Sequence, residues 1–223
     1  MTTISSAEPF VPAESDLPGL AAAARECRGC ELFESATQTV FGAGSAGASV
    51  LLVGEQPGDV EDREGVPFVG PAGRLLDRAL TEAGVDRSAA YVTNAVKHFR
   101  FKSTGNGQRR IHEKPAARHV NACEPWLAAE LTAVQPKIIV ALGATAAQAL
   151  FGSAFRVTKQ RGQLLDWPPP AGPYVGNTVP AAAALATIHP SAVLRARTPD
   201  ERETAFAGLV ADLRIVAEAQ VSR

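Results

Sequence analysis

The stretch Ser49-Val50-Leu51-Leu52-Val53-Gly54-Glu55-Gln56-Pro57-Gly58-Asp59 decides the fold, because a short apolar run passes directly into a polar segment that contains glycine. The run at 49–53 predicts a buried parallel strand, and ligands bind at the carboxyl ends of such strands in an open α/β sheet. Glycine lets backbone N–H groups approach a ligand, and Glu55 or Asp59 can hold a proton, a water or another side chain. The stretch therefore predicts both a sheet and the edge of a site.

Two further strand-like runs also end in polar residues, which strengthens this interpretation. They are Tyr91-Val92-Thr93-Asn94 and Ala184-Leu185-Ala186-Thr187-Ile188-His189-Pro190-Ser191. A run at 137–142 supplies another strand, and helical segments separate the strands along the chain. This alternation predicts a parallel sheet with helices on both faces. We expect an α/β fold with three layers, α/β/α, around a central four-stranded parallel sheet.

The helices are expected at 20–27, 71–80, 120–134, 144–150 and 199–219. The second of these has proline in its first turn and Gly84 just past its end, which are typical start and stop signals. The segment 155–167 is expected to form a small hairpin.

Composition indicates one domain of ordinary size. The chain has 223 residues, of which 46% are hydrophobic and 20% charged, enough for one sizeable core. Residues 1–18 are rich in Ser, Glu, Asp and Pro and are expected to form a flexible arm before a single domain at 19–223. We see neither a membrane-spanning stretch nor an export signal, and we expect a cytoplasmic monomer.

The formal net charge of −1 gives no general reason to expect nucleic acid, so any affinity for DNA must come from local clustering. Such a cluster lies at 97–118, where seven basic residues are opposed only by Glu113. A solvated loop would account for some of these charges. It would not account for Gly105-Asn106-Gly107, which predicts a long and mobile loop at the same place.

The chain has three cysteines, Cys27, Cys30 and Cys123. An odd number in a cytosolic protein argues against a disulfide framework. The pair Cys27 and Cys30 could be a redox pair, half of a metal site or two small buried residues. The residues alone leave these alternatives open.

Together these motifs resemble the uracil-DNA glycosylase superfamily, whose members carry an acidic and polar motif after the first strand and His-Pro-Ser after the last. The resemblance extends from about the cysteine pair to the last helix. It is greatest to the iron–sulfur members, and among them to the X-type enzymes, because of the loop Gln108-Arg109-Arg110-Ile111-His112.

The resemblance implies a [4Fe–4S] cluster held by Cys27, Cys30 and Cys123. Relatives have a fourth cysteine after the second strand, where this chain has His98, so His98 is the expected fourth ligand. A water or an outside ligand is the alternative. His119 is a weaker candidate, because we expect it on a helix surface.

The resemblance also implies how the base is held. The carboxamide of Asn94 can pair with the N–H and carbonyl edge of uracil, whereas cytosine presents the reverse pattern. Phe68 can stack on the base, although it could also be a core phenylalanine, and His189 can donate to the base oxygen that gains charge. Gln56 and Asp59 complete the expected substrate contacts.

Two residues decide the expected mechanism. In the X-type family the histidine that corresponds to His112 attacks the sugar, so that the enzyme stays bound to DNA, and Glu55 can orient that imidazole or take its proton. In a basic loop His112 could instead merely contact phosphate. The expected DNA contacts are Arg109, Arg110 and Ser191. Gln108 replaces a usual lysine, which should weaken phosphate contact more than chemistry.

Uracil-containing DNA, single- or double-stranded, is therefore the expected partner. One alternative is an ordinary hydrolytic uracil-DNA glycosylase, which would turn over repeatedly. Another is a non-catalytic iron–sulfur module that binds DNA without releasing uracil.

Overall fold

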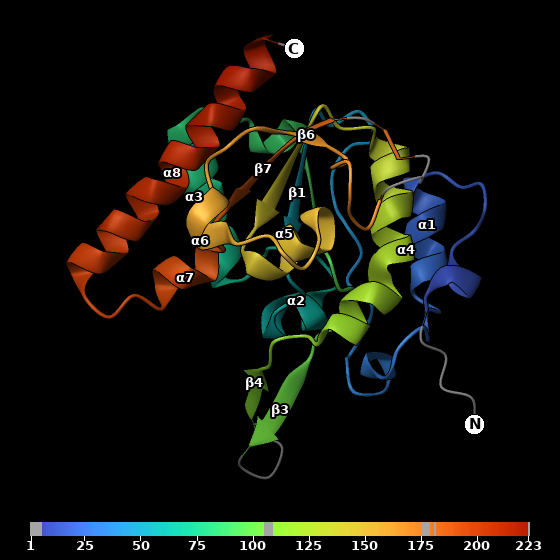
Figure 1. The fold of residues 1–223 in the computed structure, drawn as a ribbon. Helices are drawn as coiled ribbons and strands as arrows, with labels where there is room; N and C mark the ends of the chain where they lie inside the picture. Colours follow the sequence, from blue (N-terminus) through green and yellow to red (C-terminus); the bar gives the residue numbers. More distant parts are fainter. Residues whose placement is uncertain (1–5, 105–108, 175–178, 181, 223) are drawn as a thin grey trace.

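The computed structural model describes residues 6–104, 109–174, 179–180 and 182–222. A five-stranded sheet lies at its centre, with helices on both faces (Figure 1). Its order is β2-β1-β5-β7-β6, with β1 at Val50–Gly54, β2 at Ala90–Asn94, β5 at Ile138–Leu142, β6 at Leu165–Trp167 and β7 at Ala182–Thr187. Strands β2, β1, β5 and β7 are parallel. The predicted four parallel strands and the three-layer arrangement are confirmed, and a short fifth strand extends the sheet.

That fifth strand shows that the prediction of a hairpin at 155–167 was wrong. Val157–Gln160 forms the short helix α6, and β6 pairs antiparallel with β7 at the edge of the sheet. Gly162 lies between them with φ of +69°, and its N–H donates to the carbonyl of Ala186 at 2.9 Å. This bond ties the turn to β7, so the segment joins the central sheet instead of pairing with itself.

The longer helices enclose the sheet. The remaining helices are α1 (Leu17–Ala24), α2 (Asp59–Glu64), α3 (Pro71–Ala83), α4 (Ala117–Val134), α5 (Ala144–Phe151), α7 (Pro190–Leu194) and α8 (Pro199–Ser222), with short 3-10 turns at Glu8–Phe10, Glu31–Glu34 and Arg87–Ala89. The start of α3 at Pro71 and the left-handed Gly84 after its end confirm the signals read from the sequence. None of the described helices is long and apolar enough to cross a membrane.

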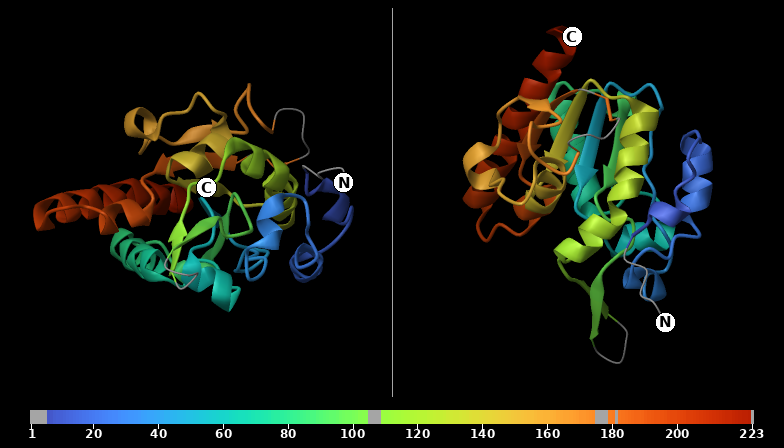
Figure 2. Two further views of the ribbon diagram at one scale, coloured as in Figure 1. Left: turned by 90° about the horizontal axis from the view of Figure 1, so that it is seen from below. Right: turned by 45° about the vertical axis from the view of Figure 1, so that its right-hand side comes forward.

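Side chains alternate between two cores, as expected for strands buried on both faces. Leu51 and Val53 pack with α1, α4 and α5, whereas Val50 and Leu52 pack with α3, α7 and α8. Figure 2 shows the sheet between these two helical layers.

The register of the sheet places its motifs together. Gly54 is paired with Asn94, and Leu142 with Thr187, so the four parallel strands end at one edge. The polar residues that follow these positions therefore emerge side by side, as the sequence predicted.

The basic segment forms a β-ribbon where the sequence indicated a loop. β3 (Phe101–Thr104) and β4 (Arg109–His112) pair antiparallel, with Phe101 opposite His112. The ribbon projects from the sheet at the end where the parallel strands finish (Figure 1). The expected mobile glycine stretch, 105–108, lies outside the described residues.

Part of the expected N-terminal arm contacts the domain. Ala7 is 1% exposed, and its N–H donates to the carbonyl of Ala122 in α4 at 2.7 Å. Asp16 accepts from the N–H of Gly19 and so caps α1. Residues 1–5 lie outside the described part of the chain.

Candidate active site

A cavity of about 500 Å³ opens at the carboxyl edge of the parallel strands. Eight of the predicted site residues line it: Glu55, Gln56, Asp59, Phe68, Asn94, His112, His189 and Ser191. They come from the segments that follow β1, β2 and β7 and from the ribbon. The topology therefore brings together residues that are up to 136 positions apart in the chain.

Gly54, which has no side chain, shapes one part of the cavity. A Cβ on Gly54 would lie 2.3 Å from Oδ1 of Asn94 and 2.6 Å from Cζ of Phe68, so only glycine lets these two groups approach each other this closely. Phe68 has a φ of +59°, which is uncommon for an aromatic residue and marks a position held by its surroundings. A buried carboxamide beside an aromatic ring can bind a flat, polar-edged ring by its edge and its face.

His189 lines the same cavity and carries an N–H donor. Its Nδ1 accepts from the backbone N–H of Ser191 at 3.1 Å, so in the neutral ring the proton must be on Nε2. Burial, and then the charge of Arg195, lower the pKa of His189 to about 4, so the ring is neutral near pH 7. The ring faces that of Phe68, with centroids 6.2 Å apart.

A carboxylate and an imidazole also meet in this cavity. Oε1 of Glu55 lies 3.5 Å from Nε2 of His112, and Oε2 of Glu55 accepts a hydrogen bond from the hydroxyl of Thr145. The His112 side chain is 47% exposed and that of Glu55 is 21% exposed. The carboxylate is therefore held from within the protein while the imidazole remains accessible. Thr145 was not predicted, although its place three residues after the end of β5 was a usable signal.

Arg110 has partners within the protein. Its guanidinium donates to Asp59 and, at 2.6 Å, to Asp62, and it lies over the rings of Phe99 and Phe101 at 5.5 and 5.0 Å. These contacts fasten β4 to α2. The structure thus pairs two residues for which the sequence predicted separate roles, Asp59 at the substrate and Arg110 at DNA.

Gln56 also supports the ribbon. Its Nε2 donates to the carbonyls of Arg100 and Glu113 at 3.1 and 3.0 Å, and its Oε1 accepts from the N–H of Arg100 at 3.2 Å. The carboxamide therefore joins the two chain segments from which the ribbon extends, and so fixes where His112 lies.

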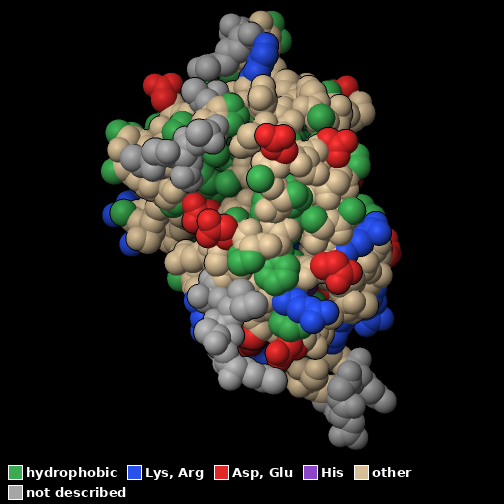
Figure 3. Space-filling model, turned by 90° about the vertical axis from the view of Figure 1, so that its right-hand side faces the viewer, with side chains coloured by type: hydrophobic (Ala, Val, Ile, Leu, Met, Phe, Trp, Pro, Cys, Tyr) green, Lys and Arg blue, Asp and Glu red, His purple; other side chains and the backbone are tan. Residues whose placement is uncertain are grey.

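Basic side chains near the cavity could meet phosphate. Arg109 is exposed on the ribbon but does not line the cavity, whereas Lys114 and Arg195 do. Lys114 belongs to the predicted basic cluster at 97–118, and Arg195 was not predicted. Ser191 accepts from the guanidinium of Arg195 at 2.9 Å. Acidic and basic side chains are interspersed on the face that carries α1 and α4 (Figure 3), so positive charge is local and not a property of the whole surface.

The three cysteines come together from two parts of the chain. All are buried with free thiols, and the pKa of Cys123 is raised to about 12, mainly by burial and further by Cys30 and Cys27. The indole N–H of Trp126 donates to Sγ of Cys27 at 3.2 Å, and the N–H of Lys97 donates to Sγ of Cys123 at 3.3 Å. Buried thiols with N–H donors aimed at sulfur suit an iron–sulfur cluster, whose thiolates need charge compensation. Within the described residues no three His, Cys, Asp or Glu side chains are arranged around a single metal ion.

The two histidines considered as ligands have distinct environments. Nε2 of His98 lies 2.9 Å from the hydroxyl of Thr39, which itself donates to the carbonyl of Ala24, so His98 is the donor and its Nδ1 keeps a free lone pair. Burial lowers the pKa of His98 to about 4, which keeps it neutral. The expectation that His119 lies on a surface was wrong. It is 1% exposed, and its nitrogens contact the N–H of Ala116 and the carboxylate of Glu31.

A buried ion pair lies next to Asn94 and was not found from the sequence. Nζ of Lys97 lies 2.5 Å from Oε2 of Glu130, and both side chains are fully buried. Nζ also donates to the carbonyl of Asn94 at 2.8 Å, and Glu130 accepts from Tyr91 and Thr93. Through its side chain and its N–H, Lys97 therefore connects Asn94 with the cysteine cluster.

The chain matches the family model described as uracil DNA glycosylase superfamily over residues 41–214. It is 34% identical over 179 residues to the Type-4 uracil-DNA glycosylase of Thermotoga maritima, covering 80% of this chain and 83% of that protein. It is 32% identical over 185 residues to the Type-4 uracil-DNA glycosylase of Archaeoglobus fulgidus, covering 81% and 84% respectively. The matched region contains every motif that forms the cavity. The chain therefore belongs to the uracil DNA glycosylase superfamily.

Proposed function

We propose that this protein excises uracil from DNA and that His112 then captures the sugar in a covalent bond. The observation that carries the proposal is the Glu55 and His112 pair, which faces the same cavity as Asn94, Phe68 and His189. The similarity to Type-4 uracil-DNA glycosylases supports uracil as the base. The residues at 108–112 that resemble the X-type enzymes support the covalent outcome.

Base release would proceed beside Asn94. The carboxamide pairs with the N–H and carbonyl edge of an extruded uracil, and Phe68 covers its face. When the bond between the sugar and the base breaks, the electron pair leaves with uracil. Negative charge then grows on the base oxygen, where the Nε2–H of neutral His189 donates a hydrogen bond.

Capture of the sugar would proceed beside His112. The cation at the anomeric carbon accepts a lone pair from the imidazole, which forms a carbon–nitrogen bond. The alkylated ring then gives up its N–H proton, which Glu55 accepts and passes on to the uracil anion. Atoms and charge balance without another reactant, and the products are free uracil and protein attached to an abasic sugar.

A denaturing gel tests the whole proposal. Protein is mixed with a labelled single-stranded oligonucleotide containing one uracil, heated in detergent and separated. The proposal expects a slowly migrating band that depends on uracil. Free abasic DNA formed in many turnovers would instead establish an ordinary hydrolytic glycosylase. DNA affinity without any release of uracil would establish a binding module.

We further propose that Cys27, Cys30 and Cys123 hold a [4Fe–4S] cluster, with His98 as the fourth ligand. The three buried thiols and their N–H donors support the first part, and the free Nδ1 of His98 supports the second. The cluster would contribute stability by linking the N-terminal segment to α4, since metal binding is coupled to folding.

Purified protein is therefore expected to be brown, with iron and sulfide in equal amounts. Cys123→Ala should lose this absorption and melt at a lower temperature, because two chain segments are no longer joined. His98→Cys should keep the colour and lower the reduction potential, since thiolate replaces imidazole. Visible absorption spectra measure the loss of colour, thermal melts measure the melting temperature, and voltammetry measures the reduction potential. If His98→Ala leaves the absorption and the potential unchanged, the fourth ligand is another group.

Asn94→Ala is expected to lower uracil release by about two orders of magnitude or more. A site built to hydrogen-bond a polar edge discriminates on the scale of about 10⁴ when that pairing is lost, so a hundredfold loss is a lower bound. DNA affinity should change little, because phosphate contacts dominate it. Initial rates and fluorescence anisotropy measure the two quantities. Normal release by this variant would place the base pocket elsewhere.

A further inference from the structure

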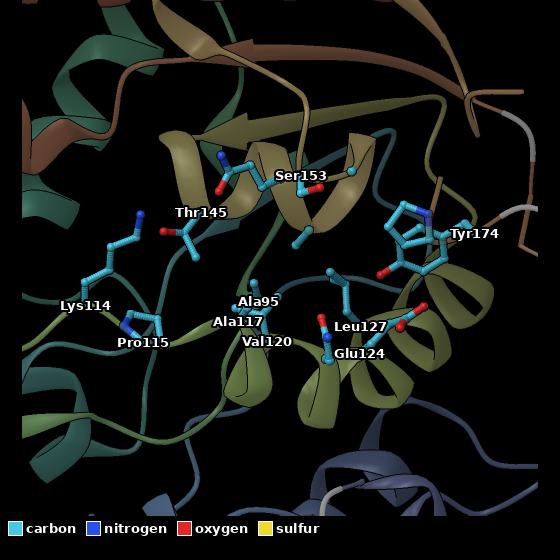
Figure 4. Close-up of a pocket in the computed structure, with 15 residues that line it drawn as sticks. Ala95, Lys114, Pro115, Ala117, Val120, Glu124, Leu127, Thr145, Ser153 and Tyr174 are labelled. Atoms are coloured by element: carbon cyan, nitrogen blue, oxygen red, sulfur yellow. The ribbon is translucent and has the colours of Figure 1, made fainter. Parts of the chain in front are cut away.

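A second cavity, of about 520 Å³, lies between α4 and α5 and shares a wall with the first. Lys114 and Thr145 line both cavities. Figure 4 shows these two side chains at one end of the second cavity and Tyr174 with Glu124 at the other. Thr145 donates a hydrogen bond to the carboxylate of Glu55. A ligand in the second cavity would therefore begin next to this carboxylate and extend away from it.

The far end of this cavity contains an unsatisfied polar group. Tyr174 is fully buried, and its hydroxyl has no hydrogen-bond partner among the residues the structure describes. Figure 4 shows that hydroxyl pointing into the cavity. Buried hydroxyls nearly always have a partner, so an unpaired one that faces a cavity indicates a polar ligand atom. Its ring is held on Trp167, with centroids 5.0 Å apart, so the hydroxyl has a fixed direction.

The walls between the two ends suit a flat, partly polar ring. Apolar contacts come from Ala95, Val120 and Leu127, and Gln148 adds a carboxamide. Glu124 adds a carboxyl group to the same lining. Lys114 supplies a basic side chain. It is exposed and lies at the end of the second cavity that is nearest to Thr145 and Glu55. Apolar walls with a few polar groups, and a cation at the mouth, fit a nucleobase whose phosphate stays outside.

We propose that this cavity binds the nucleotide next to the uridine in the DNA strand, with its base between α4 and α5 and its phosphate at Lys114. The inference rests on the proposed function, because it needs a uridine in the first cavity. A strand that places uridine beside Glu55 and continues past Thr145 reaches the second cavity with its next residue. The base is held there by its edge at Tyr174 and by its faces on the walls.

Oligonucleotides with one base removed test this proposal. Each is single-stranded with one uracil, and an abasic analogue replaces the nucleotide immediately 5′ or 3′ of it. Initial rates of uracil release should fall about tenfold for one of these two positions, the scale set by losing one bound base, and stay near the control for the other. Tyr174→Phe should release uracil more slowly than the wild type from the intact oligonucleotide. In this variant the abasic analogue should lower the rate of uracil release by only about twofold to threefold.

Ala149→Phe is a second variant, designed to fill the cavity from α5, and it should likewise reduce the effect of the missing base. Tyr174→Phe removes only an unpaired hydroxyl, so its melting temperature should not fall, which separates binding from folding. An equal loss for the abasic oligonucleotide in wild type and variants, or none at either position, would overturn the proposal. A third result would also overturn the proposal. In it, deoxythymidine monophosphate raises the melting temperature of the wild type but not that of Tyr174→Phe, and the abasic analogues have no effect on the rate. That result would identify a free nucleotide as the occupant.

Failure of the proposed function is a different result, because then no uracil is released even from the intact oligonucleotide. In that case anisotropy with the same oligonucleotides still tests the second cavity. The affinity of the wild type should fall about tenfold for one abasic position, and equal affinities for all three oligonucleotides would contradict the proposal.

Discussion

His112→Ala is expected to give no heat-stable complex with uracil-containing DNA, a loss of about three orders of magnitude or more. Removal of an enzyme's nucleophile has effects on this scale. The imidazole is held 3.5 Å from Glu55, and it is exposed enough to meet the sugar. Denaturing gels of protein with uracil-containing and uracil-free oligonucleotides measure the adduct. A cross-link that survives in this variant would identify another nucleophile.

The variants at this position also separate capture from release. His112→Gly opens space for water and should convert the protein toward hydrolytic turnover, with abasic DNA as a free product. Glu55→Gln should slow adduct formation while DNA binding stays the same, because the hydrogen bond from Thr145 can persist but the acceptor of the proton is lost. Arg109→Ala is a suitable control. It lies on the same ribbon but does not line the cavity, so it should weaken DNA binding and leave the chemical step unchanged.

Lys97→Met is expected to destabilise the protein by about 3–5 kcal/mol, because it leaves the fully buried carboxylate of Glu130 without its counter-charge. Urea denaturation monitored by circular dichroism measures this change in the free energy of unfolding. The matched control is Lys102→Met. Lys102 lies at a similar distance, 2.6 Å, from Glu113, but it is 71% exposed. The control should change stability far less, since water and ions screen exposed pairs.

A second variant separates the electrostatic cost from the connection to the active site. Lys97→Met with Glu130→Leu removes both charges and should recover much of the lost stability. It should still release uracil more slowly, because the side-chain bond from Lys97 to the carbonyl of Asn94 is gone. If Lys97→Met alone is as stable as Lys102→Met, the buried pair does not contribute as we expect.

Much of the fold could be predicted from local sequence. The apolar run at Val50–Gly54, the proline and glycine that bound α3, and the alternation of strands with helices each carry a local physical signal. The hairpin expected at 155–167 was wrong, because the segment pairs with β7 and not with itself. That choice depends on β7 having a free edge in the folded sheet, which cannot be read from the local sequence.

The site divides in the same way. Glu55, Asn94 and His189 could be predicted to converge, because strand ends in a parallel sheet share an edge. Their partners could not. That Thr145 holds Glu55, or that Arg110 binds Asp59 and Asp62, depends on distances between segments far apart in the chain.

The sequence by itself thus determined the sheet, its helices and the edge at which polar residues gather, since propensity and periodicity act over a few neighbouring residues. Only the tertiary structure decided that Lys97 pairs with Glu130 under Asn94, that Gly54 makes room for Phe68, and that Tyr174 faces a second cavity. The physical reason is that burial, hydrogen-bond partners and empty space are properties of packed surfaces. They come into existence only when distant segments meet.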